Sequence, residues 1–179
     1  IDICITSSQK CLGLPAGLAA CTFSRKAVER AKTVQNRGFY LDLLQLYDFI
    51  QKKDYQYPST PSLAHMFALD YQLDYIINEE GLENRFARHE EMMEMVREWA
   101  GRKFALLAED DIASRTVTTV VNTRNIDISE LNRELKKRGM MISNGYGELK
   151  DKTFRIAHMA DTTPAQITEL LDNLDDILG

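Results

Sequence analysis

The sequence predicts an α/β protein in two parts, residues 1–80 and residues 81–179. Two short apolar runs near the start, residues 1–6 and 18–23, are typical of strands. The middle of the chain carries apolar residues at helical spacing. From Phe104 onward, short strand patterns alternate with two segments that begin with helix caps. A chain of 179 residues is long enough for one good core or two small ones.

In the first part, the unbroken apolar run at residues 1–6 is expected of a strand covered on both faces. Residues 18–23 form a second strand, and the short Gly/Pro turn between the two favours antiparallel neighbours. Ser24 is expected to cap a helix that ends near Lys32, and residues 41–50 predict another helix. Residues 55–62 are polar, aromatic and broken by proline, which predicts a loop.

Residues 63–78 predict a helix, and Gly81 separates it from a longer amphipathic helix that leads toward the second part. The apolar residues with helical spacing on the longer helix are Leu82, Phe86, Met93, Val96 and Ala100. The second part is then a small α+β unit. Its expected strands are residues 104–108, 117–121, 140–143 and 153–158, and its expected helix starts are Asp127 and the capping box from Thr163 to Gln166. The last helix is expected to bury Ile167, Leu170, Leu171, Leu174, Ile177 and Leu178.

Composition excludes several classes of function. A net charge of −5 with scattered basic residues argues against a general nucleic-acid binder, and no apolar run is long enough to span a membrane. Cys4, Cys11 and Cys21 lack the paired spacing of a metal site, so we expect small buried residues in a reducing, cytoplasmic compartment and no metal. The chain opens with Ile1 and has no segment like a signal peptide, so we expect a fragment of a longer protein.

The most informative segment is residues 2–17, a strand followed by a Ser/Thr loop, Lys10 and a Gly/Pro-rich turn. A lysine just past the end of an apolar strand suits covalent chemistry. In a partly dry site its amine can lose a proton and attack a carbonyl to form a Schiff base. A solvated surface lysine is the ordinary alternative.

Two later segments also carry candidate binding groups. In residues 56–61, Tyr57 and Thr60 offer hydroxyl donors that suit a phosphate, and a proline-set surface turn is the alternative. In residues 153–159, Arg155 lies among apolar strand residues, where a guanidinium needs a partner. It could bind a substrate carboxylate through two hydrogen bonds or form a structural salt bridge. Residues 144–147 indicate a turn near the substrate mouth, and His158 is expected to be a packed or capping residue.

Together, Gln9-Lys10, the Tyr57–Thr60 segment and the Arg155 segment resemble, in order, the class V aminotransferases, which are fold type I pyridoxal-phosphate enzymes. The resemblance is to the alanine–glyoxylate and serine–pyruvate aminotransferase branch. It implies that Lys10 forms the Schiff base with pyridoxal 5′-phosphate and that Gln9 binds the cofactor phosphate. It also implies that Tyr57 and Thr60 reach the neighbouring subunit's cofactor in a homodimer, and that Arg155 grips the substrate carboxylate.

The resemblance further implies that residues 1–80 end the large domain and that residues 81–179 form the small C-terminal domain. The expected substrates are a small amino acid, such as alanine or serine, and a 2-oxo acid, such as glyoxylate or pyruvate. In this family the ring-nitrogen carboxylate, the phosphate-binding helix and the stacking side chain lie upstream of the lysine segment, so the fragment alone is expected to be inactive. The alternatives are a phosphoserine aminotransferase, a cysteine desulfurase-like lyase, or a non-catalytic α/β dimerisation module. No Cys follows Cys21, which weighs against a desulfurase.

Overall fold

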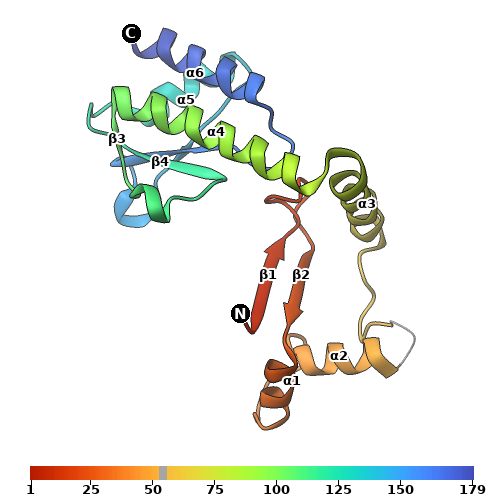
Figure 1. The fold of residues 1–179 in the computed structure, drawn as a ribbon. Coiled ribbons are helices and arrows are strands. Elements are labelled where there is room, and N and C mark those ends of the chain that lie inside the picture. Colours follow the sequence, from red (N-terminus) through yellow and green to blue (C-terminus); the bar gives the residue numbers. More distant parts are fainter. Residues whose placement is uncertain (53–55) are drawn as a thin grey trace. The chain divides into compact units, whose positions relative to one another are not determined.

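The computed structural model describes residues 1–52 and 56–179, and the chain divides into two compact units (Figure 1). The first unit is Ile1–Asp74 and the second is Tyr75–Gly179; each is described by itself. Tyr55, where the expected loop begins, lies outside the described residues. Within the described ranges, no helix combines the length and the apolar character that a membrane crossing requires.

The first unit begins with a β-hairpin. Strand β1 (Ile3–Ser7) pairs with β2 (Ala19–Phe23) in antiparallel register, with Ile5 opposite Cys21, and this confirms the predicted pair. Helix α1 (Arg25–Lys32) follows directly, and the Ser24 hydroxyl accepts a hydrogen bond from the Ala27 N–H at its first turn. The predicted Ser24 cap is therefore confirmed.

Helices α2 (Leu43–Lys52) and α3 (Leu63–Asp74) complete the first unit, with ends that differ by a few residues from those expected. Residues 56–62 contain neither helix nor strand, in agreement with the predicted loop. A π-helical turn, Tyr75–Glu80, opens the second unit where the sequence predicted a continuous helix to residue 78.

Two expectations about burial in the hairpin are wrong. Ile3 and Ile5 are 49% and 65% exposed, whereas the apolar run predicted a strand covered on both faces. Cys4 and Cys11 are exposed and Cys21 is half-buried, although all three were expected to be buried. Because a two-stranded hairpin has two open faces, its apolar side chains stay in contact with solvent unless another layer covers them.

The second unit contains a four-stranded antiparallel sheet in the order β3-β4-β6-β5. Its strands are β3 (Ala105–Leu106), β4 (Val117–Val121), β5 (Ser143–Asn144) and β6 (Thr153–Ala157). The two central strands have the predicted positions. The edge strand β3 is shorter than the predicted 104–108, and the predicted strand at 140–143 is displaced, since β5 shares only Ser143 with it. Each edge strand pairs with a single neighbour over only two residues.

Three helices cover one face of this sheet: α4 (Leu82–Lys103), α5 (Ile128–Lys137) and α6 (Pro164–Leu178) (Figure 1). The Asp127 carboxylate caps α5, and Thr163 and Gln166 form the reciprocal capping box that the sequence predicted for α6. Two short 3₁₀ turns, Asp110–Ile112 and Gly147–Leu149, lie in the connections. The core between helices and sheet includes Met92, Val96, Trp99, Val120, Leu135, Phe154, Ile156, Ile167, Leu171 and Leu174.

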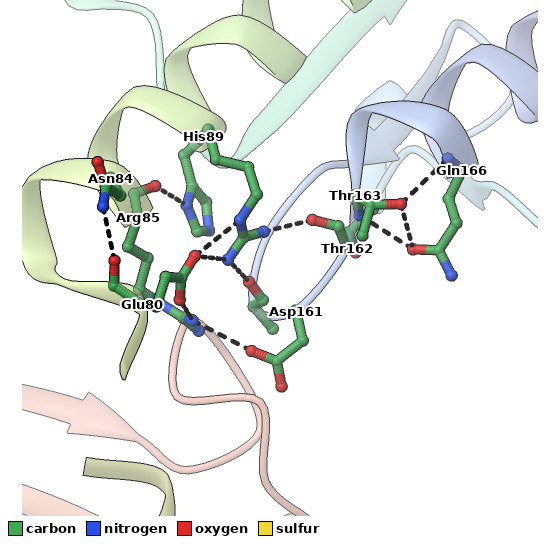
Figure 2. A network of polar contacts seen from close by, with 10 residues as sticks. Glu80, Asn84, Arg85, His89, Asp161, Thr162, Thr163 and Gln166 are labelled. Carbon is green, nitrogen blue, oxygen red and sulfur yellow. Dashed lines mark hydrogen bonds and ion pairs between the residues drawn. The ribbon is translucent and has the colours of Figure 1, made fainter. Parts of the chain in front are cut away.

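The first half of α4 presents a different face from the one predicted. Leu82 and Phe86 are 48% and 57% exposed, while Arg85 and His89 are buried. The reason is a network of ion pairs and hydrogen bonds, in which these polar side chains find partners in the interior (Figure 2). Arg85 pairs with Glu80 at 2.6 Å and with Asp161 at 3.1 Å.

Arg88 extends the same network. Its guanidinium pairs with Glu80 and donates hydrogen bonds to the carbonyls of Ala160 and Thr162, in the loop that follows β6. Ala160 has a positive φ of 62°, a conformation that a residue with a Cβ adopts only where its surroundings hold it. The two arginines of α4 therefore fix the segment that joins β6 to α6.

Candidate active site

Lys10 lies in a closed turn at the end of β1, and Ser8 holds that turn together. The Ser8 hydroxyl is buried; it donates to the Pro15 carbonyl at 2.7 Å and accepts from the Leu18 N–H at 3.3 Å. The Ser8 backbone also bonds Leu18 and Leu14, each at 2.9 Å. These bonds close the turn, and Gln9 and Lys10 lie on its exposed side.

Gln9 and Lys10 are both exposed in this chain. Within the part of the chain that the structure describes, the Lys10 ammonium makes no ion pair and no hydrogen bond. The partly dry surroundings that Schiff-base chemistry requires would have to come from groups outside the described residues. The chain does supply an amine that no carboxylate of the described residues pairs with, next to the side-chain amide of Gln9.

His65 links the lysine turn to the start of α3. Its Nε2 lies 3.1 Å from the Ala16 carbonyl, and its Nδ1 lies 2.8 Å from the Ser62 hydroxyl. One neutral tautomer satisfies both contacts, with Nε2–H donating to Ala16 and Nδ1 accepting from Ser62. Gly17 has a φ of 139°, and a Cβ there would lie 2.8 Å from His65 Nε2, so glycine permits this close approach.

Tyr57 and Thr60 lie in the segment just before this link. Tyr57 is 40% exposed and Thr60 is exposed. In the described residues, no hydrogen bond joins either hydroxyl to Gln9 or Lys10. Both hydroxyls remain available to an external acceptor.

Arg155 extends from β6 on the face of the sheet opposite the core. Its neighbours Phe154 and Ile156 are buried among the helices, and Arg155 itself is half-buried. Its Nε donates to the Asn144 carbonyl at 3.1 Å. No carboxylate among the described residues pairs with it, so the structural salt bridge that the sequence left open is not formed there.

Tyr146 is a contact that sequence reasoning missed. Its ring lies against the Arg155 guanidinium, with 4.2 Å between the guanidinium carbon and the ring centroid. The sequence predicted only that residues 144–147 form a turn near the substrate mouth. An aromatic residue in that turn, close to a strand arginine, is the signal that could have indicated stacking.

His158 is packed in the interior, as predicted. It is fully buried, and its Nε2 lies 2.9 Å from the Thr118 hydroxyl. Burial is the main reason that the pKa of His158 is lowered to about 4, and charge repulsion from His89 acts in the same direction. His89 donates one hydrogen bond from Nδ1–H to the Arg85 carbonyl at 2.6 Å. These two histidines form an interior pair that the sequence did not predict.

The candidate residues thus fall into three groups with different chemistry. The lysine turn offers an amine and an amide, residues 56–62 offer two hydroxyls, and β6 offers a cation whose outer nitrogens make no hydrogen bond with the described residues. An amine can attack a carbonyl, hydroxyls can donate to a phosphate, and a guanidinium can bind a carboxylate through two parallel bonds.

Comparison with known proteins assigns these groups to a family. The family model described as aminotransferase class-V matches residues 1–163. A serine–glyoxylate aminotransferase of Arabidopsis thaliana is 35% identical over 182 residues, which cover 99% of this chain and 45% of the relative. An uncharacterized aminotransferase of Methanocaldococcus jannaschii is 42% identical over 89% of this chain and 42% of its own length.

Solved structures show the same relationship. The alanine–glyoxylate aminotransferase of Nostoc sp. superimposes with a TM-score of 0.88 and 25% identity, over 100% of this chain and 48% of that protein. The pyridoxamine–pyruvate aminotransferase of Mesorhizobium loti gives a TM-score of 0.85 and 30% identity, over 99% of this chain and 46% of that protein. The chain spans about half the length of the relatives it matches and has the α/β architecture of half a fold type I aminotransferase. It belongs to the class V aminotransferases, in the branch of the alanine–glyoxylate and serine–glyoxylate enzymes.

Proposed function

We propose that this chain provides the lysine turn and the substrate-carboxylate site of a pyridoxal-phosphate aminotransferase. The enzyme would move an amino group between a small amino acid, alanine or serine, and a 2-oxo acid, glyoxylate or pyruvate. The observation that carries this proposal is Arg155, a half-buried strand arginine whose outer edge has no partner in the described residues. Both proposed substrates carry a carboxylate beside the reacting carbon, and an arginine held in this way suits it.

The residues present fit the cofactor that the family uses. Gln9, Tyr57 and Thr60 offer amide and hydroxyl donors, which suit a phosphate because they add no negative charge. When bound, pyridoxal 5′-phosphate supplies a sink for the electrons released as the substrate loses its α-proton. In this proposal Lys10 holds the cofactor covalently and then moves a proton at the substrate α-carbon, while Arg155 orients the substrate through its carboxylate.

The proposal assigns the phosphate contacts of Tyr57 and Thr60 to a neighbouring subunit, which makes the enzyme a homodimer. Residues 1–80 would end the large cofactor-binding domain, and residues 81–179 would form the small domain. The ring-nitrogen carboxylate and the stacking side chain would come from a preceding segment, since this chain matches about half of its relatives' length. The cytoplasm is the proposed location.

The test uses protein that carries this chain together with the preceding half that its relatives have. Pyridoxal 5′-phosphate is added, the Schiff base is reduced with borohydride, and the labelled lysine is located by peptide mass mapping. We expect one label per chain, on Lys10. Lys10→Ala should remove the label, whereas Lys26→Ala, which changes an exposed lysine of α1, should retain it. Label spread over several lysines, or absent, would contradict the proposal.

A substrate comparison then separates the related activities. L-alanine and L-serine are offered as donors with glyoxylate or pyruvate as the acceptor, and O-phosphoserine is offered in parallel. Preferred turnover of O-phosphoserine would replace the proposed function with that of a phosphoserine aminotransferase. A labelled Lys10 without any transamination would leave the cofactor site intact and overturn the proposed reaction.

A further inference from the structure

We propose that Tyr146 is a positioning residue for the substrate carboxylate. Its ring and the Asn144 carbonyl together hold the Arg155 guanidinium so that the edge formed by Nη1 and Nη2 faces the carboxylate end-on. This inference rests on the proposed function, in which Arg155 binds the carboxylate. It adds that the Tyr146 ring and the Asn144 carbonyl set the orientation of the Arg155 guanidinium.

The geometry of a guanidinium limits how it can be held and still bind an anion. The group is planar, and its five N–H bonds lie in the plane, so an aromatic ring can cover a face without using a donor. The Tyr146 ring lies against Arg155 at 4.2 Å, the distance of a cation–π contact. The ring therefore restrains the guanidinium and leaves its hydrogen-bonding edges open.

The Asn144 carbonyl selects which edge remains. It accepts the Arg155 Nε–H at 3.1 Å, so the side edge that includes Nε is already in use. Among the described residues, neither Nη1 nor Nη2 makes a hydrogen bond or an ion pair. Two parallel bonds to a carboxylate can then form only at the end of the guanidinium.

The turn that carries Tyr146 is itself held in place. The Asn144 side chain accepts from the N–H groups of Gly145 at 2.7 Å and Asp151 at 2.9 Å, and it donates to the Asp151 carboxylate at 2.7 Å. The Gly145 N–H also donates to the Thr153 carbonyl at 2.9 Å. The ring thus starts from a backbone that is fixed before substrate arrives, which lowers the entropy lost on binding.

Exposure of Tyr146 makes its role testable. The side chain is 76% exposed, so truncating it removes little buried apolar area and should leave stability nearly unchanged. What changes is the freedom of Arg155, whose long side chain has several rotatable bonds. Loss of the ring should therefore appear in substrate binding and not in folding.

The experiment measures KM and kcat for L-alanine and glyoxylate in the whole holoenzyme. Tyr146→Leu keeps a shorter apolar side chain but has no π face. We expect it to raise KM for both substrates by about fivefold to twentyfold, with kcat changed by no more than about twofold. Tyr146→Phe should restore KM, because it keeps the ring face. Met141→Ala, which truncates an exposed side chain just before β5, is the control and should leave both constants unchanged.

A ligand without a carboxylate gives the decisive comparison. L-alaninamide binding is followed by titration of the cofactor absorbance, and Tyr146→Leu should leave its dissociation constant unchanged. Equal weakening of L-alaninamide and L-alanine would overturn the inference, since the variant would then disturb the site as a whole. Failure of Tyr146→Phe to restore KM would also overturn it, because the hydroxyl and not the ring face would matter.

Arg155→Lys separates this inference from the proposed function. If that variant raises KM strongly while Tyr146→Leu does not, the positioning role of Tyr146 is wrong and the carboxylate site stands. If neither variant changes KM, the assignment of Arg155 itself fails, and the role of Tyr146 fails with it. If neither L-alanine nor L-serine is transaminated, the proposed function fails independently of Tyr146.

Discussion

The His158 ring shares a hydrogen bond with the Thr118 hydroxyl, 2.9 Å from Nε2, in the interior of the second unit. The Thr116 carbonyl accepts the backbone N–H of His158 at 3.0 Å, so the residue is fixed at the end of β6. Within the described residues, His158 Nδ1 and His89 Nε2 have no hydrogen-bond partner. A proton on His158 would therefore be buried without a carboxylate to balance it.

The first prediction is that His158 makes stability depend on pH between about 4 and 6.5. The ordinary histidine pKa is 6.5, and burial lowers that of folded His158 to about 4. In this window the unfolded chain binds a proton that the folded chain does not, so the free energy of unfolding rises with pH. The effect is at most about 3 kcal/mol. Urea unfolding at a series of pH values measures it.

His158→Gln is the matched variant, since an amide can still bond to Thr118 but does not titrate in this range. It should flatten the rise between pH 4 and pH 6.5 while other groups act as before. The same slope in both proteins would show that His158 is not the source.

The second prediction concerns Gly145. A Cβ there would lie 2.5 Å from Thr153 Oγ1 and closer still to the Leu149 carbonyl. Gly145→Ala must therefore push the turn away from β6, and we expect it to destabilise the protein by about 1–3 kcal/mol. Denaturant unfolding measures the loss. Because Tyr146 is the next residue, KM for L-alanine should rise as well.

Gly101→Ala is the control for this substitution. Gly101 is in α4, and a Cβ there would meet nothing within 4 Å. Alanine is a better helix former than glycine, so this variant should gain about 0.5–1 kcal/mol of stability. If both variants shift stability in the same direction, the close packing of Gly145 does not govern the turn.

The third prediction concerns Glu80. Burial raises the pKa of its carboxyl, but hydrogen bonds from Arg85 and Arg88 outweigh that effect and leave the pKa lowered. Glu80→Gln removes the negative charge that pairs with both Arg85 and Arg88, and Arg85 is only 5% exposed. We expect a loss of about 2–4 kcal/mol at pH 7 by urea unfolding.

The same variant has a defined pH dependence. A carboxyl with a lowered pKa contributes stability above its unfolded pKa of 4.5, and that contribution disappears as pH falls through the folded pKa. The difference between wild type and Glu80→Gln should therefore shrink below about pH 4.5. Glu94→Gln changes an exposed carboxylate on α4 and should have little effect at any pH.

The sequence predicted the local features of the fold well, because local chemistry determines them. Ser24, Asp127 and Thr163 begin helices where their side chains can accept the first free N–H groups. The buried face of α4 could not be predicted in the same way. The burial of Arg85 depends on Asp161, a residue 76 positions away, and helical spacing alone gives no sign of that pair.

The candidate site shows the same contrast between features that the sequence indicates and features that depend on distant residues. The roles of Lys10, Tyr57 and Thr60 come from a resemblance in sequence, and they stay predictions. Tyr146 was visible in the sequence as part of a glycine-containing turn. Its stacking on Arg155 could not be predicted in the same way, because it depends on the pairing of β5 with β6, which brings the turn over the strand.

The fourth prediction is that Arg155→Lys weakens substrate binding. A lysine keeps the charge but cannot make two parallel bonds to a carboxylate, and it loses the flat stack on Tyr146. We expect a loss of about 1.5–3 kcal/mol in kcat/KM, which is roughly tenfold to 150-fold. Steady-state kinetics with L-alanine measures it. Arg115→Lys changes an exposed arginine whose ion pair to Glu90 is also exposed, and it should alter kcat/KM by less than about twofold.

The fifth prediction tests whether Tyr57 and Thr60 act in the neighbouring subunit. The double variant Tyr57→Phe with Thr60→Val removes two hydroxyl donors from the proposed phosphate site. Each hydrogen bond to a charged group contributes about 1.5–3 kcal/mol, so cofactor affinity should fall by at least about tenfold. Equilibrium dialysis against pyridoxal 5′-phosphate measures this in the whole enzyme.

A mixed dimer then distinguishes the two arrangements. One subunit carries Lys10→Ala, and the other carries Tyr57→Phe with Thr60→Val, so neither parental homodimer has an intact site. If the hydroxyls cross the interface, one site combines all the substitutions and the other combines none. The mixed dimer should then regain one cofactor per dimer, with label on the single remaining Lys10 after borohydride reduction. If the hydroxyls serve their own subunit, each site keeps a defect and no high-affinity binding returns, which would reject the crossed arrangement while leaving the role of Lys10 in place.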